Sequence, residues 1–249
     1  MISNLYSSPK TKHIYKMNRK PSWLKVKLNF GPEYQKVKSL LDELNLNTVC
    51  QEANCPNIGE CFSAKTATFI ILGNKCTRNC RFCDIKPGKP SSPDLEEPSR
   101  IAQAVKRMEL KYVVLTMVTR DDLPDGGSKI FAETIRQIRN DIPECKVEAL
   151  VSDFNGDISS LDNIIDATPD VIAHNLETVP HLYPTVRPQA DYKRSLRILK
   201  HSSGKATKSL TKSGIMVGLG EDIKQITNVL SDAVNVGCKI FTVGQYLSP

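Results

Sequence analysis

Hydrophobic and polar residues alternate along this chain with two different periods. Six short runs rich in β-branched and aromatic residues have the composition of strands. They cover residues 68–72, 112–118, 147–151, 171–175, 214–219 and 240–246. Helix-like stretches cover residues 34–44, 98–109, 127–140, 158–166, 191–202 and 222–236, and the polar residues 202–213 are predicted to form a loop. Alternating strands and helices indicate βαβ units around a parallel sheet.

The predicted fold is α/β, a partial (β/α)6 TIM-like barrel with an N-terminal extension. A Rossmann sheet fits less well, because no glycine-rich dinucleotide turn follows the first strand. We expect three regions: a basic arm at residues 1–32, the extension at residues 33–67 and the partial barrel at residues 68–249. In such barrels the functional residues lie at the carboxyl ends of the strands.

Composition narrows the class of protein. The 249 residues, 40% of them hydrophobic, are enough to bury a sizeable core. No run of about 18 apolar residues occurs, so we expect no membrane partner. The net charge of +7 comes from seven basic residues before Glu33, and the remaining 27 basic residues match the 27 acidic ones. Since the body of the chain is neutral, we expect no nucleic-acid partner.

The basic arm allows three interpretations. A solvated, partly disordered tail is the simplest. The arm would also suit the steering of an acidic partner, or an organellar transit peptide. Clustered cysteines indicate metal ligands in a reducing compartment rather than disulfides. We therefore expect a cytoplasmic location, or an organellar one if the arm is a transit peptide.

Six of the eight cysteines form two triplets with different spacings. They are Cys50-x4-Cys55-x5-Cys61 and Cys76-x3-Cys80-x2-Cys83. A structural zinc site usually has four protein ligands, whereas an iron–sulfur cluster held by three cysteines leaves one iron open. Two triplets therefore indicate two clusters and chemistry at iron, and they make the N-terminal extension a cluster-binding region.

The second triplet follows the first predicted strand, at the functional end of the barrel. Phe82, directly before Cys83, would form an apolar wall beside the open iron. Zinc would need a fourth ligand, but the nearest histidines are His13 and His174, far away along the chain. Cys145 and Cys238 lie in or beside predicted elements, where a free cysteine usually packs as a small hydrophobic residue.

The motif Cys76-x3-Cys80-x2-Cys83 resembles that of radical S-adenosylmethionine enzymes. The resemblance implies a [4Fe–4S] cluster whose open iron chelates S-adenosylmethionine. Reduction of that cluster would cleave the cofactor to a 5′-deoxyadenosyl radical.

The first triplet, within NTVCQEANCPNIGEC at residues 47–61, closely resembles the auxiliary-cluster motif of the lipoyl synthase family. The likeness extends over nearly all of the chain from about residue 20. Its further segments are KPSWLKVK (20–27), TRDDLPDGG (119–127), HNLET (174–178), TVRP (185–188), GLGE (218–221) and GQYL (244–247).

This resemblance implies insertion of two sulfur atoms, at C6 and C8 of an octanoyl group bound to a carrier-protein lysine. Cys50, Cys55 and Cys61 would hold the sacrificial cluster that supplies the sulfur. The implied partners are an octanoylated carrier, either a dehydrogenase E2 lipoyl domain or the glycine-cleavage H protein, and an electron donor such as ferredoxin or flavodoxin.

Several other residues become candidates for binding S-adenosylmethionine. Gly126 and Gly127 would let the backbone approach its methionine part, although on the sequence alone an ordinary glycine-rich loop with an N-terminal cap is the favoured explanation. Asn175 and Glu177, after the fourth strand, would contact its ribose or amino-acid end. Arg187 would clamp its carboxylate. We expect His174 to be structural.

The family pattern includes an Arg-Ser-Ser segment near its C-terminus, whose serine is the fourth ligand of the auxiliary cluster. The sequence up to Pro249 contains no such segment. We expect a chain with this sequence alone to be an impaired or inactive fragment.

From the residues alone, two alternative functions remain open. A non-enzymatic iron–sulfur or zinc-binding electron carrier would need a fourth ligand near each triplet, and none is seen. A different radical enzyme, such as one resembling biotin synthase, would not explain the first triplet.

Overall fold

The computed structural model describes residues 31–248. The predicted basic arm lies almost entirely outside these residues. The first described helix, α1 (Pro32–Glu43), begins with proline at its N-terminus, where the missing N–H costs no hydrogen bond. It buries Val37, Leu40 and Leu41, which share one helical face. Over residues 31–248, no helix combines the length and apolarity needed to cross a membrane.

A seven-stranded sheet forms the centre of the molecule, and its strands follow one another in chain order. Six strands are parallel: β2 (Thr68–Ile71), β5 (Tyr112–Met117), β6 (Lys146–Leu150), β7 (Val171–Ala173), β8 (Leu210–Val217) and β9 (Ile240–Gln245). The short β1 (Asn47–Thr48) pairs antiparallel with β2. β1 and β9 lie at opposite edges, so the sheet is open. The predicted partial six-stranded barrel is confirmed.

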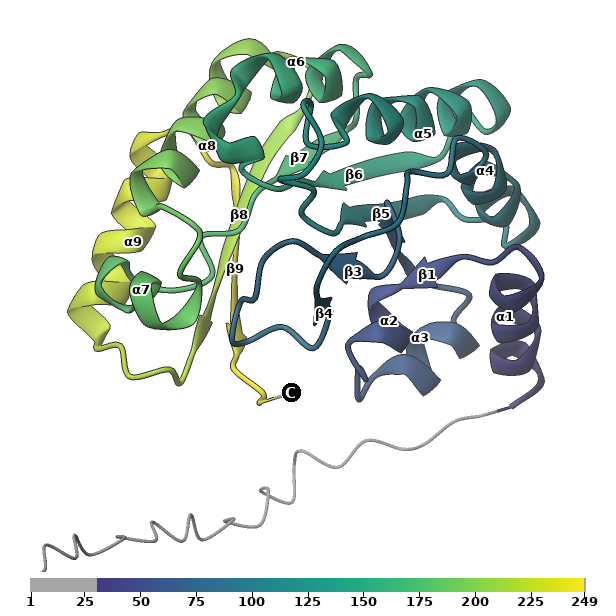
Figure 1. Ribbon diagram of the computed structural model, residues 1–249, viewed down its shortest axis with the longest axis horizontal. Coiled ribbons are helices and arrows are strands. Elements are labelled where there is room, and N and C mark those ends of the chain that lie inside the picture. Colours follow the sequence, from purple (N-terminus) through teal and green to yellow (C-terminus); the bar gives the residue numbers. More distant parts are fainter. Residues whose placement is uncertain (1–30, 249) are drawn as a thin grey trace, which may run out of the picture.

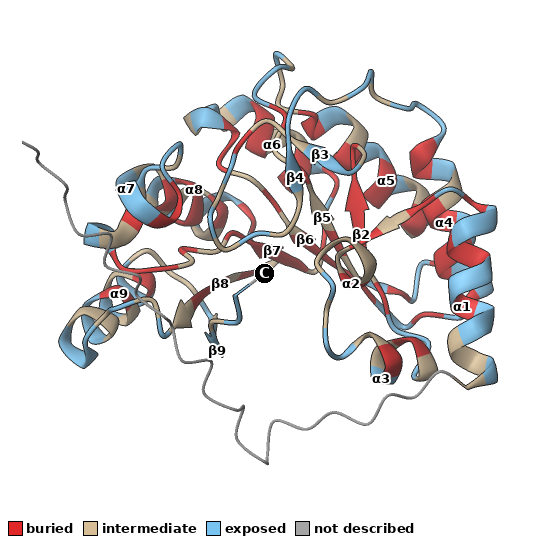
Figure 2. Ribbon diagram, turned by 60° about the horizontal axis from the view of Figure 1, so that its bottom comes forward, coloured by how far each residue is buried: buried red, intermediate tan, exposed pale blue. Residues whose placement is uncertain are grey.

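The long helices lie along the outer side of this curved sheet (Figure 1). They are α4 (Glu97–Arg107), α5 (Ser128–Asp141), α6 (Ile158–Asp166), α8 (Tyr192–Lys205) and α9 (Ile223–Asn235). Their inner faces and the central strands contain most of the buried residues, whereas β9 is largely exposed (Figure 2). Phe69, Ile71, Leu115 and Phe131 are fully buried, each contributing about 1.5–3 kcal/mol to stability.

Short elements at the ends of the sheet carry the candidate site. The N-terminal segment continues through α2 (Val49–Glu52) and α3 (Ile58–Ser63) before it enters β2. After β2, a loop contains the two-stranded pair β3 (Lys75–Cys76) and β4 (Lys86–Pro87) on the inner side of the main sheet (Figure 1). The other short elements are η2 (Phe154–Gly156), η3 (Pro180–Leu182) and α7 (Tyr183–Val186).

The prediction that residues 202–213 form a loop is wrong. α8 continues to Lys205, and β8 already begins at Leu210. Small polar residues are typical of loops, but here they belong to regular elements. The Ser202 hydroxyl donates to the carbonyl of Ile198 within the helix, and Ser213 is fully buried in the strand. The other predicted strands and helices are present, with boundaries shifted by a few residues.

Candidate active site

A cavity of about 280 Å³ lies at the carboxyl ends of the strands. Its walls come from α2 and its C-cap (Val49 and Ala53), from β2 and the cysteine loop after it, from the ends of β5, β6 and β7, and from Arg187. All three cysteines of the second triplet line it. The apolar part of the wall includes Phe82, Ile85 and Met117. This is the end of a barrel at which functional residues are expected.

The loop that carries the second triplet is fixed mainly by hydrogen bonds to neighbouring segments. Both the N–H and the hydroxyl of Thr77 donate to the carbonyl of Thr119, just after β5. The N–H of Arg81 donates to the carbonyl of Val186, and the N–H of Gly88 to that of Cys76. The loop is therefore bonded to the ends of β5 and α7.

The three thiols lie close enough to influence one another's ionisation. Burial raises the pKa of Cys83 to about 11, and the Cys80 and Cys76 thiolates raise it in the same direction. Burial also raises the pKa of Cys80, against the opposing charge of Arg187. In the metal-free chain the Cys80 and Cys83 thiols are protonated at neutral pH, so iron binding must release their protons.

A buried ion-pair network joins this loop to the ends of two strands. The side chain of Arg78 is only 3% exposed and binds the carboxylates of Asp121 and Asp153 at 2.7 Å each. Asp153 is also held at 2.8 Å by Arg194 of α8. Its pKa is lowered to about 2, because the favourable bonds to Arg78 and Arg194 outweigh its burial.

Arg187 occupies the side of the cavity next to β7. One of its terminal nitrogens donates to the carbonyls of Asn175 and Leu176, and its guanidinium lies 5.2 Å from the centre of the Tyr183 ring. Its Nε is buried and has no hydrogen-bond partner among the described residues. A buried unpaired donor on a cationic side chain suits an anionic ligand group such as a carboxylate.

Glu177 and Asn175 complete the polar part of the cavity. Glu177 has a left-handed backbone (φ 65°), an uncommon conformation for a side chain of this kind. Burial raises the pKa of its carboxyl group, while Arg187 opposes that shift. The pair provides oxygen acceptors in the cavity that the cysteine loop also lines, and such acceptors suit an ammonium group or hydroxyls.

His174 is structural, as expected. Its two ring nitrogens are bonded to the Val151 carbonyl at 2.9 Å and to the Ser195 hydroxyl at 3.0 Å. Burial, with a contribution from Arg187, lowers its pKa to about 4. The imidazole is neutral at physiological pH, and its two hydrogen bonds connect the end of β7 to the end of β6 and to α8.

The first triplet is spread over α2, α3 and the turn between them. Cys50 is buried in α2, and Thr48 caps that helix by accepting the N–H of Gln51. Burial raises the pKa of Cys50, and the charges of Cys55 and Cys61 act in the same direction. These three thiols are therefore also neighbours.

Within residues 31–248, no three His, Cys, Asp or Glu side chains converge on a point where a single metal ion would bind. A cubane cluster does not require the thiolates to converge on one point, because each thiolate binds a separate iron. The second triplet suits such a cluster in its chemistry, because its three thiols and the cationic Arg187 line the same cavity. The residues present therefore fit a cluster with an anionic ligand beside it.

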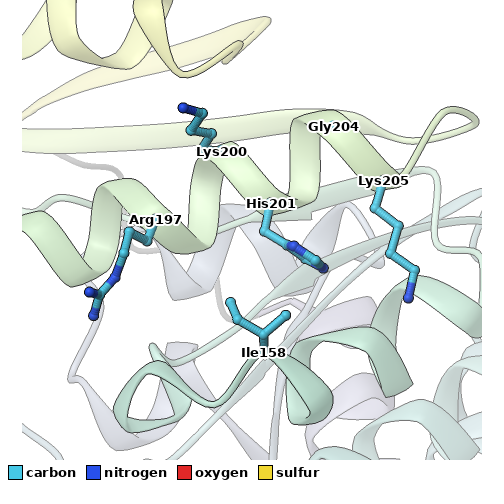
Figure 3. Close-up of a pocket in the computed structure, with 6 residues that line it drawn as sticks. All are labelled: Ile158, Arg197, Lys200, His201, Gly204 and Lys205. Atoms are coloured by element: carbon cyan, nitrogen blue, oxygen red, sulfur yellow. The ribbon is translucent and has the colours of Figure 1, made fainter.

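A second depression, of about 600 Å³, lies on the outer surface between α6 and α8 (Figure 3). It is lined by Ile158 and by basic side chains of α8 that include Arg197 and Lys200. His201 and Lys205 both contact Asp162 at its edge. Because it contains no cysteine and shares no lining residue with the cavity at the strand ends, it is not the chemical site.

Most of the predicted site residues meet in one cavity. Those that line it are Cys76, Cys80, Phe82, Cys83, Asn175, Glu177 and Arg187. Gly126 and Gly127 do not line it, and their contact with a cofactor stays a prediction. Both have left-handed backbones, and an added Cβ at Gly127 would lie 2.2 Å from Leu72.

Sequence reasoning missed Arg78 and Asp153, which line the same cavity. Asp153 follows β6 at its carboxyl end, so the rule that selected Asn175 and Glu177 would have found it. Arg78 lies within the cysteine motif itself, but nothing in the sequence indicates its partners.

The fold and the cysteine loop define a radical S-adenosylmethionine enzyme. The sequence profile of the Radical SAM superfamily matches residues 70–233. Methylornithine synthase, a solved structure, superimposes with a TM-score of 0.57 at 15% sequence identity, covering 90% of this chain and 66% of that one. At this identity the likeness concerns the fold alone.

The profile for the N-terminal domain of lipoyl synthase matches residues 4–55. A lipoyl synthase of Caldicellulosiruptor saccharolyticus is 54% identical over 93% of this chain and 81% of that protein. A lipoyl synthase of Rubrobacter xylanophilus is 53% identical over 92% of this chain and 72% of that protein. The chain belongs to the lipoyl synthase family.

Family membership confirms the enzyme interpretation over the non-enzymatic one. The chain is a sulfur-inserting radical S-adenosylmethionine enzyme, and its cofactors are [4Fe–4S] clusters and S-adenosylmethionine.

Proposed function

We propose that Cys76, Cys80 and Cys83 hold the cluster that activates S-adenosylmethionine. Cys50, Cys55 and Cys61 hold a second, auxiliary cluster within an extension formed by residues 33–67. The observation that carries this assignment is the cavity at the strand ends, which is lined both by the second triplet and by Arg187 with its unpaired Nε. The first triplet lies in α2, α3 and the turn between them rather than in the loop after β2, which suits a separate role.

The cofactor site is formed by Phe82, Asn175, Glu177 and Arg187. Arg187 binds the carboxylate of S-adenosylmethionine through its free Nε, which replaces an unpaired buried donor with a charge-assisted hydrogen bond. Asn175 and Glu177 accept hydrogen bonds from its ammonium or ribose groups, and Phe82 keeps water from the cluster face. When bound, the cluster and the cofactor supply a carbon radical able to remove a hydrogen atom from an alkyl chain.

The substrate is an octanoyl group amide-linked to a lysine of a carrier protein, either an E2 lipoyl domain or a glycine-cleavage H protein. At C6 and again at C8, a C–H bond would break as its hydrogen atom passes to the cofactor-derived carbon radical, and a carbon–sulfur bond would form to sulfur given up by the auxiliary cluster. The apolar wall with Ile85 and Met117 suits the alkyl chain. Electrons come from a ferredoxin or flavodoxin. We place the protein in the cytoplasm, because its ligand thiols must stay reduced.

The test is mass spectrometry of an octanoylated carrier peptide, incubated with the iron-loaded protein, S-adenosylmethionine and a reductant. The expected product carries two added sulfur atoms in place of two hydrogens. With Cys50→Ala, we expect 5′-deoxyadenosine to form without sulfur insertion, and with Cys76→Ala neither product. Unchanged sulfur insertion by Cys50→Ala would overturn the assignment of the auxiliary triplet.

A further inference from the structure

We propose that Arg78 is a positioning residue for the cluster-binding loop, and that Asp153 is its buried anchor. Together they hold the segment between Cys76 and Cys80 against the ends of β5 and β6, so that the thiols keep the spacing a cluster needs. This inference rests on the proposed role of Cys76, Cys80 and Cys83 as cluster ligands.

The hydrogen bonds of Arg78 reach two different strand ends. Its Nε and one terminal nitrogen grip both oxygens of Asp121, at 2.7 and 2.9 Å. That terminal nitrogen also donates to Asp153 at 2.7 Å and to the side-chain carbonyl of Asn155 at 2.9 Å. A planar guanidinium can satisfy carboxylates on two sides at once, which the single ammonium of lysine cannot do in the same geometry.

Asp153 extends the connection to the outer helix layer. Its side chain is fully buried, and its second oxygen accepts a bond from Arg194 of α8 at 2.8 Å. The network thus contains two arginines and two aspartates, so the buried charges are balanced. Removal of Arg78 or Asp153, the two buried members, would leave a buried charge unpaired, which is costly, whereas Asp121 is partly exposed.

Arg78 also acts directly on a ligand atom through its backbone. Its N–H donates to the sulfur of Cys76 at 3.4 Å. Hydrogen bonds to ligand sulfurs and the groups around them tune the affinity and the potential of a metal site. The Arg78 side chain holds this peptide group in place. Loss of that side chain would therefore disturb both the loop and the hydrogen bond to the Cys76 sulfur.

The experiment compares Arg78→Lys with Arg81→Lys in the full chain, loaded with iron and sulfide without oxygen. Arg81 lies in the same loop, but its side chain is exposed. We measure iron bound per chain and the rate of iron release to a chelator. For Arg78→Lys, we expect release from one of the two clusters to become about 10-fold faster. Arg81→Lys should behave as the unaltered chain.

Thermal unfolding of the metal-free proteins separates positioning from folding. Asp121→Asn serves as the second variant, because Asp121 is partly exposed and its change leaves the Asp153–Arg194 pair intact. We expect faster iron release from Asp121→Asn with an unfolding temperature close to that of the unaltered chain. Normal iron release from both Arg78→Lys and Asp121→Asn would overturn the inference. If Cys76→Ala itself kept both clusters, the proposed ligand assignment would fail instead.

Discussion

The side-chain amide of Asn54 donates a hydrogen bond of 2.5 Å to the carboxylate of Asp84. Asn54 directly precedes Cys55, and Asp84 directly follows Cys83. This bond therefore joins the two cysteine segments, which lie about thirty residues apart in the sequence. It offers a way to keep the two proposed clusters at a fixed separation.

Replacement of Asn54 by Asp should weaken this connection, because two carboxylates would then face each other. We expect faster release of iron to a chelator. The unfolding temperature of the metal-free chain should change little, since exposed contacts contribute about 1 kcal/mol or less. Asn57→Asp adds the same charge at an exposed position three residues away and should leave iron release unchanged. Equal effects of both variants would mean that charge alone, not the bond to Asp84, is responsible.

Replacing cysteines should separate the two clusters by their iron content. The loaded chain should bind about eight irons, and either Cys50→Ala or Cys80→Ala should lower this to about four. Cys145→Ala is the control, because Cys145 is buried beside β6, away from both triplets. Iron and acid-labile sulfide analysis measures the result. Loss of all iron from either single variant would contradict two independent clusters.

Arg187→Lys should weaken binding of S-adenosylmethionine to the iron-loaded protein. Lysine keeps the charge but loses the Nε donor and the planar fork. A hydrogen bond to a charged group contributes about 1.5–3 kcal/mol, so we expect the dissociation constant to rise about 10- to 100-fold. Equilibrium dialysis measures it. Arg197→Lys, on the exposed outer face of α8 (Figure 3), should bind the cofactor normally. Unchanged binding by Arg187→Lys would contradict the carboxylate clamp.

Gly127→Ala should destabilise the chain even without metal. Gly127 has φ 83°, and an added Cβ would lie 2.2 Å from the Leu72 side chain, which must then move. We expect a loss of about 1–3 kcal/mol from strain and overpacking. Gly204→Ala is the matched control, since Gly204 lies in α8 with open space around it. That change should stabilise the chain by up to about 1 kcal/mol. Denaturant unfolding of both variants measures these changes in the free energy of unfolding.

Acid should destabilise the metal-free chain through His174. The unfolded imidazole takes up a proton near pH 6.5, whereas the buried one does so only near pH 4. Between these values the unfolded state binds more protons, so stability falls as the pH falls, by roughly 3 kcal/mol in all. The free energy of unfolding of His174→Gln should depend less on pH over this range than that of the unaltered chain. An equal slope in both proteins would assign the acid sensitivity to other groups.

The sequence determined the fold class and the chemistry. Strands are short runs of β-branched and aromatic residues, and cysteine spacing is a local property, so both can be read from neighbouring positions. The six parallel strands and the two triplets follow from such local patterns. The pattern failed at residues 202–213, where serine and threonine fill a helix end and a strand whose burial depends on distant packing.

Only the tertiary structure decided which polar residues act together. Arg78 and Asp153 lie 75 positions apart, and Asn54 and Asp84 lie 30 apart, so no local pattern could pair them. The structure also left Gly126 and Gly127 outside the cavity lining, where an added Cβ would lie 2.9 Å from Phe154 and 2.2 Å from Leu72, respectively. The sequence fixes which chemical groups are present. The curvature of the parallel sheet decides which strand ends meet, and so which of these groups share one cavity.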